Sequence, residues 1–346
     1  MYDFAPPRRR IYLRLSVTDC CSLRCRYCRP EGDVDWSGGH SSLPNAGRNA
    51  CPTRPDIYPL DSNSSRASRE ELLAITELIA QEFHVYKVRL TGGEPLLAAD
   101  PPDLVVCLRT KLPHLEEIGM TTNGLALRRY ARSLRRAGLQ SLNISLDTLD
   151  VAAYRHLTRG GRLTTVLDGI AAAREAGFDH LKLNAVLLRT INGDGLCDLV
   201  RFAARCDCEI RFIELMPCGE GAGLYATEFL SADEALTRLT AAFEYLGAAA
   251  DSATARRHRL LVEGQALLVG FITAVSHPFC DTCDRLRVDC RGQLFSCLRS
   301  ADGIDLLEPL RNGRIEEVRR RIRRGLAKKC IPTELWPQRT IAAIGG

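Results

Sequence analysis

The segment Cys21-Ser22-Leu23-Arg24-Cys25-Arg26-Tyr27-Cys28 places three cysteines in one short loop. Three thiolates are one fewer than the four that close a structural zinc site or an ordinary iron-sulfur cluster. The Cys-x3-Cys-x2-Cys spacing can hold three irons of a [4Fe-4S] cube and leave the fourth iron free for an external ligand. The competing interpretation is a zinc knuckle completed by Cys20 or by a distant histidine.

A second trio lies near the other end of the chain, as Cys280-x2-Cys283-x13-Cys297. Arg285 and Arg287 come directly after Cys283, and Cys290 also lies in the longer gap before Cys297. The trio predicts either a zinc ribbon completed by Cys290 or a second [4Fe-4S] cluster whose open iron meets a substrate held by the two arginines.

Composition narrows the functional class. The chain has 346 residues, 15 cysteines and a net charge of only +5, so it gives no sign of a nucleic-acid binder. No apolar run is long enough to span a bilayer and no secretory segment precedes the first trio, so we expect no membrane association. Cysteine-rich chains without export signals point to metal ligation in a reducing cytoplasm.

Short apolar runs alternate with helical patterns from Ile11 to about Met216, which predicts parallel βα units. A capping box of Ser68 and Glu71 predicts the start of one helix. The expected strands are Tyr12 to Val17, Lys87 to Thr91, Glu117 to Thr122, Leu142 to Leu146, Leu181 to Leu188, and Ile210 to Met216.

Polar residues recur at every second position in several of these strands, although parallel strands covered on both faces should be continuously apolar. One face therefore lines a polar cavity, as in a barrel opened into an active site. Six units predict an incomplete (β/α)6 TIM barrel over residues 1–225, interrupted by an inserted loop at 32–67 and followed by a smaller domain over 226–346. The chain ends in Gly345 and Gly346, a pair that predicts either a frayed end or a thin tail able to enter a narrow site.

Strand ends carry the remaining motifs. Thr91-Gly92-Gly93-Glu94-Pro95 lets backbone groups approach a ligand closely, and Thr121 and Ser145 lie at two further strand ends. Cations inside a barrel need anionic partners, which are either internal carboxylates such as Glu214 or a highly charged substrate such as a nucleoside triphosphate. The cations expected to face inward are Arg14, Arg89, Lys182 and Arg211.

Together, both trios, the Gly-Gly-Glu-Pro loop, Arg285-Leu286-Arg287 and the diglycine end resemble the GTP 3′,8-cyclase family of radical S-adenosylmethionine (SAM) enzymes over nearly the whole chain. The resemblance implies a partial TIM barrel with two [4Fe-4S] clusters. It assigns Cys21, Cys25 and Cys28 to the SAM cluster and Cys280, Cys283 and Cys297 to the second. It implies SAM contacts at Tyr27, Gly93, Ser145 and Met216, and GTP contacts at Arg14, Arg89, Thr121, Lys182, Arg285, Leu286 and Arg287, to which the inward-facing Arg211 is added.

The resemblance also implies a reaction. A 5′-deoxyadenosyl radical made from SAM removes hydrogen from C3′ of GTP, and the product is (8S)-3′,8-cyclo-7,8-dihydroguanosine 5′-triphosphate, the first intermediate of molybdenum cofactor biosynthesis. The expected partners are GTP, an electron donor and a downstream cyclic pyranopterin monophosphate synthase. The sequence does not decide whether the protein forms a homodimer. The rival interpretations are a radical SAM peptide maturase with an auxiliary cluster and a non-catalytic zinc or iron-sulfur protein.

Two departures from the family pattern stand out. Typical members have a shorter segment where this chain has residues 32–67. Cys20 stands beside the first ligand where an arginine is usual, and it could compete as a ligand. We expect it not to compete, because the three-residue step from Cys21 preserves the motif.

Overall fold

The computed structural model describes residues 9–30, 66–178, 180–252, 254–300, 302–327 and 336–337. Nearly all of the inserted loop 32–67, together with Gly345 and Gly346, lies outside the described residues. Expectations for those segments stay predictions.

One twisted sheet organises the described part of the chain, with the strand order β12-β11-β10-β1-β2-β3-β4-β5-β6-β9-β8-β7. The strands from β10 to β9 in this order pair in parallel with their neighbours. The six strands of the N-terminal part are β1 (Arg10–Ser16), β2 (His84–Thr91), β3 (Glu117–Thr122), β4 (Ser141–Ser145), β5 (His180–Leu187) and β6 (Glu209–Glu214). These six form the incomplete barrel that the sequence predicts, and each predicted strand is present with ends shifted by a few residues at most.

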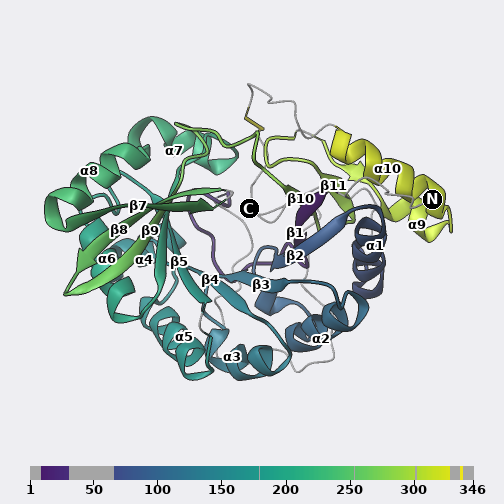
Figure 1. Ribbon diagram of the computed structural model, residues 1–346, viewed down its shortest axis with the longest axis horizontal. Helices are drawn as coiled ribbons and strands as arrows, with labels where there is room; N and C mark the ends of the chain where they lie inside the picture. The colour runs from purple at the N-terminus through teal and green to yellow at the C-terminus, as the bar shows by residue number, and fades with distance from the viewer. Residues whose placement is uncertain are drawn as a thin grey trace, which may run out of the picture.

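Helices cover the outer side of the arc that these strands make, as Figure 1 shows. The first of them begins at the predicted capping box, where the Ser68 hydroxyl accepts from the Glu71 amide and the Glu71 carboxylate accepts from the Ser68 amide at 2.6 Å. The helical elements of this part are α1 (Arg69–Glu82), a 3-10 turn (Pro95–Leu97), α2 (Pro101–Lys111), α3 (Leu127–Arg136), α4 (Val151–Thr158), α5 (Leu163–Glu175) and α6 (Leu196–Arg205).

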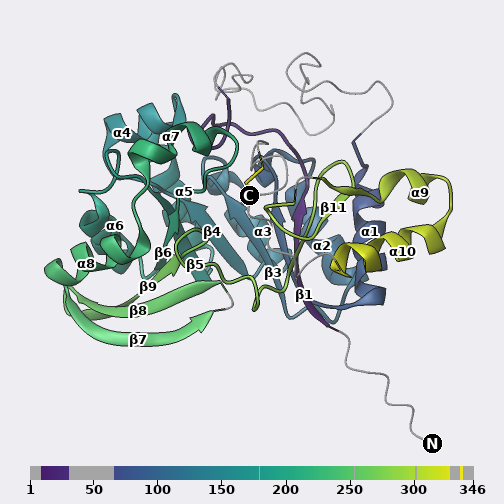
Figure 2. The same cartoon turned by 90° about the horizontal axis from the view of Figure 1, so that it is seen from above.

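The C-terminal part adds strands to both edges of the same sheet. Strands β7 (Glu244–Ser252), β8 (Ala255–Val262) and β9 (Gln265–Ile272) continue it beyond β6, and β10 (Arg285–Val288), β11 (Gln293–Phe295) and β12 (Ile304–Asp305) continue it beyond β1. Its helices are α7 (Glu220–Glu228), α8 (Ala232–Ala242), α9 (Leu307–Arg311) and α10 (Ile315–Ala327). Figure 2 shows β7 and β8 at one side of the molecule and α9 and α10 at the other. The boundary expected between residues 225 and 226 falls within α7, and the division into two domains stays a prediction.

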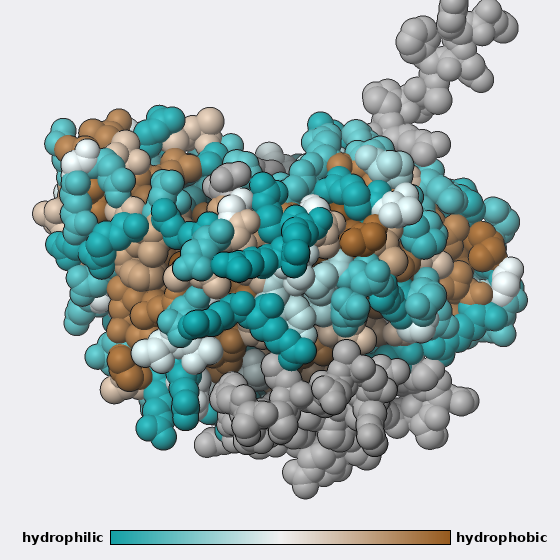
Figure 3. Space-filling model, turned by 90° about the horizontal axis from the view of Figure 1, so that it is seen from below, coloured by the Kyte–Doolittle hydropathy of each residue, from teal (hydrophilic) through white to brown (hydrophobic). Residues whose placement is uncertain are grey.

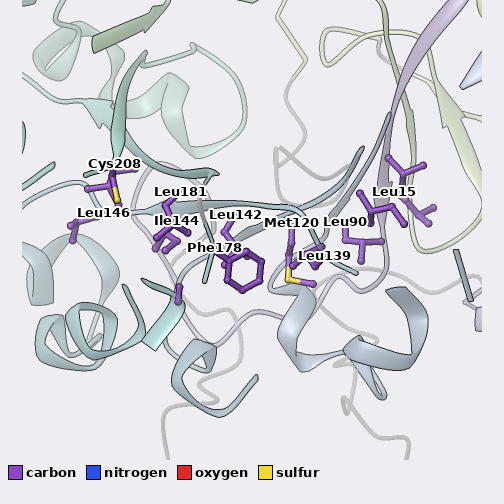
Figure 4. Packing of buried hydrophobic residues seen from close by; sticks show 14 of the residues in the cluster. Leu15, Leu90, Met120, Leu139, Leu142, Ile144, Leu146, Phe178, Leu181 and Cys208 are labelled. Atoms are coloured by element: carbon purple, nitrogen blue, oxygen red, sulfur yellow. The ribbon is translucent and has the colours of Figure 1, made fainter. Parts of the chain in front are cut away.

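The alternation along each strand sends apolar side chains outward to the helices and polar ones inward. On β1, Ile11, Leu13 and Leu15 are completely buried in the main hydrophobic cluster, while Tyr12 and Arg14 face the interior of the arc. Figure 4 shows Leu15, Leu90, Met120, Leu142 and Ile144 following one another across successive strands of this cluster. The apolar layer therefore holds the helices and leaves the inner face free for a site.

The surface seen in Figure 3 is mostly hydrophilic, with smaller apolar areas between the polar side chains. Within the described ranges, no helix has both the length and the apolar character needed to cross a membrane.

Candidate active site

Both cysteine trios line one cavity of about 690 Å³ on the inner face of the arc. This volume lies within the usual range of sites that hold small molecules and cofactors. All six predicted cluster cysteines line it. The two trios are more than 250 residues apart in the chain. The fold thus gathers the two motifs that the sequence singled out.

The first trio lies in the loop after β1. Burial, the largest cause, raises the pKa of the Cys21 thiol to about 12, and burial together with Cys28 and Asp147 holds the pKa of Cys25 well above its usual value. The Leu23 amide and the Asn123 side-chain amide donate to Cys21 Sγ at 3.5 and 3.8 Å. Buried thiols supported by N–H donors suit a cluster, because bound iron supplies the positive charge that ionises them.

Neither trio converges tightly enough to hold a single metal ion, and the same is true of the other described histidine, cysteine, aspartate and glutamate side chains. A [4Fe-4S] cube is larger than one ion and takes its thiolates at wider separation. Soft sulfur donors beside an open cavity fit that group. The alternative ligands Cys20 and Cys290 are both buried, and neither belongs to the set of described residues that line the cavity.

The four residues expected to contact SAM, namely Tyr27, Gly93, Ser145 and Met216, all line the cavity beside the first trio. Gly93 is required by close packing, since a Cβ there would lie 2.1 Å from the Cys20 carbonyl oxygen. Its amide donates to Thr18 O at 2.8 Å, and the next amide, of Glu94, donates to Cys20 O at 2.6 Å. The glycine loop and the cysteine loop are therefore held against each other by backbone hydrogen bonds.

Two buried carboxylates that the sequence did not single out brace this end of the cavity. Glu94 accepts from the Leu96 amide, the Thr122 hydroxyl and the Asn123 amide at 2.7 to 3.0 Å, which links the ends of β2 and β3. Burial raises its pKa to about 7. Asp147 accepts from the Tyr27 hydroxyl at 2.9 Å and from the Val186 amide at 2.8 Å, and so ties the cysteine loop to β4 and β5. Glu94 stands in the Gly-Gly-Glu-Pro motif and Asp147 follows Ser145 by two residues, but only the fold shows which groups they bind.

The second trio lies around β10 and β11, where Cys283 and Cys297 contribute to the electrostatic surroundings of Cys280. The Cys297 amide donates to Ser300 Oγ at 3.1 Å, and the Arg299 amide approaches Cys297 Sγ at 3.4 Å. Burial raises the pKa of the Cys280 thiol. These three thiols also suit a cluster, and they line the cavity in which the substrate is expected.

Three predicted substrate arginines form a cationic wall beside the second trio. Arg14 on β1 lies opposite Arg287 on β10, and Arg285 lies one step along the same strand face. All three line the cavity. Burial, then Arg14 and Arg285, hold the pKa of Arg287 well below its usual value, and the pKa of Arg14 falls to about 10 mainly through burial. Such mutual repulsion of buried cations is relieved by a highly negative ligand.

Arg89, Lys182 and Arg211 have internal carboxylate partners, and Arg89 and Lys182 do not belong to the described residues that line the cavity. Arg89 is only 2 % exposed and donates to Glu117 at 3.1 Å, and Lys182 donates to Glu209 at 2.8 Å. Arg211 also contacts Glu209, at 2.5 Å, and lines the cavity.

Glu214, which the sequence offered as an example of an internal carboxylate partner, is not the carboxylate that these cations contact. It accepts from the backbone amides of Ala232, Val275 and Ser276 and from the Ser276 hydroxyl. The suggestion was wrong because Glu214 lies at the carboxyl end of β6, where it fixes two connecting segments, whereas Glu117 and Glu209 lie at the starts of β3 and β6.

The two remaining predicted contacts lie in different surroundings. Thr121 lines the cavity, and its buried hydroxyl oxygen has no hydrogen-bond partner among the described residues. Leu286 has a completely buried side chain in the main hydrophobic cluster, on the face of β10 opposite to Arg285 and Arg287. A ligand in the cavity could therefore contact the backbone of Leu286 but not its side chain.

Tyr12 was missed as a site residue, although it shares the inner face of β1 with Arg14. Its hydroxyl accepts from Arg89 Nε at 2.6 Å, and Lys87 Nζ lies 5.1 Å from the centre of its ring. Burial alone would raise its pKa, but the charges of Arg89, Arg14, Lys87 and Arg285 overcome burial and lower the pKa to about 7. The alternating pattern of the strand, extended by one step, could have found it.

The chain matches two protein-family models in succession. Residues 15–203 match the radical SAM superfamily and residues 208–333 match the Molybdenum Cofactor Synthesis C family.

Curated relatives match over almost the whole chain. A GTP 3′,8-cyclase of Streptomyces coelicolor is 35% identical over 96% of this chain and 93% of its own length. One of Pseudomonas putida is 40% identical over 92% of this chain and 88% of its own length.

Among solved structures, Streptococcus suis SuiB bound to precursor peptide SuiA matches with a TM-score of 0.58, covering 84% of this chain and 60% of that one. At 14% identity the likeness to SuiB concerns the fold alone.

Proposed function

The chain belongs to the GTP 3′,8-cyclase family of the radical SAM superfamily, and from that premise we propose how its own residues carry out the reaction. It is an enzyme that converts GTP to (8S)-3′,8-cyclo-7,8-dihydroguanosine 5′-triphosphate, the first step of molybdenum cofactor biosynthesis. The observation that carries the proposal is the single cavity shared by both cysteine trios and the arginines of β1 and β10.

Cys21, Cys25 and Cys28 would hold the cluster that binds SAM, and Cys280, Cys283 and Cys297 would hold the second cluster. When bound, the first cluster and SAM supply the one-electron chemistry that removes a hydrogen atom from the substrate. Tyr27, Gly93, Ser145 and Met216 surround SAM, and Asp147 keeps Tyr27 in place through its hydrogen bond. These residues orient the reagent, which is the part of the chemistry that a protein supplies to a cofactor.

The substrate lies between the trios, with its triphosphate against the cationic wall. Arg14, Arg285 and Arg287 are expected to contact it directly, and Thr121, Lys182 and Arg211 come from the neighbouring strands β3, β5 and β6. Arg89 donates to Tyr12, Met120 O, Glu117 and Ser141, so we assign it a positioning role through Tyr12. Leu286 contributes through its backbone.

Enclosure of the reacting atoms is as important for this reaction as binding of the nucleotide. A carbon-centred reaction needs its two reacting atoms in contact and other hydrogen donors kept away. The polar inner face of the arc holds the nucleotide, and the apolar layer behind it keeps the strands rigid.

The remaining assignments also belong to the proposal. They are an electron donor for the first cluster, a downstream cyclic pyranopterin monophosphate synthase that would take the product, and a cytoplasmic location. A role of Gly345 and Gly346 in cyclisation is also part of the proposal, and both residues lie outside the described part of the chain. Support comes from Trp336, ten residues upstream of the end, which lines the cavity and stacks on Arg299 at 4.0 Å from ring centre to guanidinium.

The direct test is anaerobic incubation of the reconstituted protein with SAM, dithionite and GTP, followed by mass spectrometry. We expect 5′-deoxyadenosine and an isomer of GTP to form together. Formation of 5′-deoxyadenosine with unchanged GTP would retain the radical SAM chemistry and overturn the substrate. Absence of both products from protein with intact, reducible clusters would overturn the proposed reaction.

Ionisation of Tyr12 should weaken GTP binding as pH rises. Below a pKa of about 7 the phenol is neutral, and above it a phenolate partly neutralises the cations that attract the triphosphate. The affinity of the native protein for GTP, relative to that of Tyr12→Phe, should therefore fall roughly three- to ten-fold as pH rises through neutrality.

The comparison with Tyr12→Phe removes the effect of the nucleotide's own terminal phosphate, because that group titrates equally with both proteins. Equilibrium dialysis between about pH 6 and pH 8 measures the ratio. A ratio that stays flat over this range would show that Tyr12 does not ionise beside the substrate.

A further inference from the structure

Three neighbouring side chains in the middle of the cavity carry buried oxygen atoms that lack hydrogen-bond partners among the described residues. They are the hydroxyl of Thr121 and the amide Oδ1 atoms of Asn143 and Asn184, and all three residues line the cavity. Asn143 is only 7 % exposed. Buried polar atoms in proteins are nearly always satisfied, so a group of three in one cavity indicates a ligand that satisfies them.

The sheet register locates this group between the two halves of the site. Thr121 on β3 lies opposite Asn143 on β4, and Ser145, two residues further along β4, lies opposite Asn184 on β5. Asn184 in turn lies opposite Arg211 on β6. Asn184 therefore lies between Ser145, assigned to SAM, and Arg211, assigned to the nucleotide. Asn143 lies between Thr121 and Lys182, which are both assigned to the nucleotide.

The chemistry of the unsatisfied atoms selects the part of the ligand. An amide carbonyl oxygen accepts hydrogen bonds and cannot donate them. A triphosphate offers only acceptors, whereas the ribose carries two hydroxyl donors beside the carbon that loses hydrogen. A contact to those hydroxyls would also fix the sugar in the orientation that hydrogen removal needs.

We propose that Asn143 and Asn184 accept hydrogen bonds from the 2′- and 3′-hydroxyls of GTP and make the site selective for a ribonucleotide over a 2′-deoxyribonucleotide. The inference rests on the proposed function, since it takes GTP as the substrate. A site built to bond a hydroxyl discriminates strongly against an analogue without it, because the protein acceptor is then left buried and unpaired.

The test is binding of GTP and of 2′-deoxyGTP to the reconstituted protein, measured by calorimetry without SAM or reductant. The native protein should prefer GTP by about ten-fold or more, which corresponds to one lost hydrogen bond. Of Asn143→Ala and Asn184→Ala, the variant that removes the acceptor of the 2′-hydroxyl should bind GTP no more tightly than 2′-deoxyGTP. The variant that removes the acceptor of the 3′-hydroxyl should bind both nucleotides more weakly, and both variants should keep the native iron content. Asn312→Ala, which removes an exposed asparagine on the loop after α9, should keep the native preference.

Equal affinity of the native protein for the two nucleotides would overturn the inference while leaving GTP as the ligand, and this measurement requires no variant to fold. A native preference that survives both alanine variants would likewise overturn it. If neither nucleotide binds, the proposed function fails together with the inference.

Discussion

Replacement of Arg287 by alanine should lower kcat/KM for GTP by roughly 10³-fold, the usual scale for removing a preorganised charge from an active site. Arg287 is 5 % exposed, and Arg14 and Arg285 lie close enough to lower its pKa. Burial and the two neighbouring cations make the charged form of Arg287 costly, and a bound anion lowers that cost. The variant should therefore lose far more in turnover than in thermal stability.

Turnover and melting temperature, measured on the same variant, distinguish a role of Arg287 in substrate binding from a role in stability. Arg287→Lys should recover only part of the activity, because an ammonium cannot reproduce a planar guanidinium contact. Arg128→Ala is a matched control, since Arg128 lies on α3 with 74 % of its side chain exposed in a surface ion pair. Turnover of Arg287→Ala within a few-fold of the native value would contradict the assignment of the cationic wall to the substrate.

The two trios should fail in different ways when each loses one cysteine. Native protein reconstituted without air should contain about eight irons per chain, and either variant should contain about four. Cys25→Ala should abolish cleavage of SAM, because the first cluster is the one that binds it. Cys297→Ala should still bind SAM and cleave it slowly, but should form no cyclised nucleotide.

Iron and sulfide analysis, combined with separate assays of 5′-deoxyadenosine and cyclised product, checks this pattern. Cys206→Ala removes a cysteine that packs against the hydrophobic cluster away from the cavity, and it should keep the full iron content. Loss of all iron from both trio variants would show that the two sites do not form independently. Full cyclisation by Cys297→Ala would exclude the second trio from the reaction.

The six strands of the arc could be predicted because two independent signals agree. Short apolar runs gave their positions, and polar residues at every second position gave the face that lines the cavity. The helix starting at the Ser68 and Glu71 box was predictable for a local reason, since its cap needs only residues three apart. The spacing of the cysteines predicted two cluster loops, and the fold brings both trios to one cavity.

Long-range pairing could not be predicted in the same way. Strand β10 lies beside β1 although about 270 residues separate Tyr12 from its partner Arg285, and no local pattern encodes that register. The choice of Glu117 and Glu209 over Glu214 depends on the level of each carboxylate along the strands, which follows from the same register. Asn143 and Asn184 were visible as polar strand residues, but their unsatisfied oxygens appear only once the neighbouring side chains are in place.

Transfer of deuterium from GTP labelled at C3′ tests the central claim most directly. We expect the 5′-deoxyadenosine formed during turnover to gain one mass unit from this substrate, and the cyclised product to lose the label. Unlabelled 5′-deoxyadenosine formed together with product that retains deuterium at C3′ would contradict it.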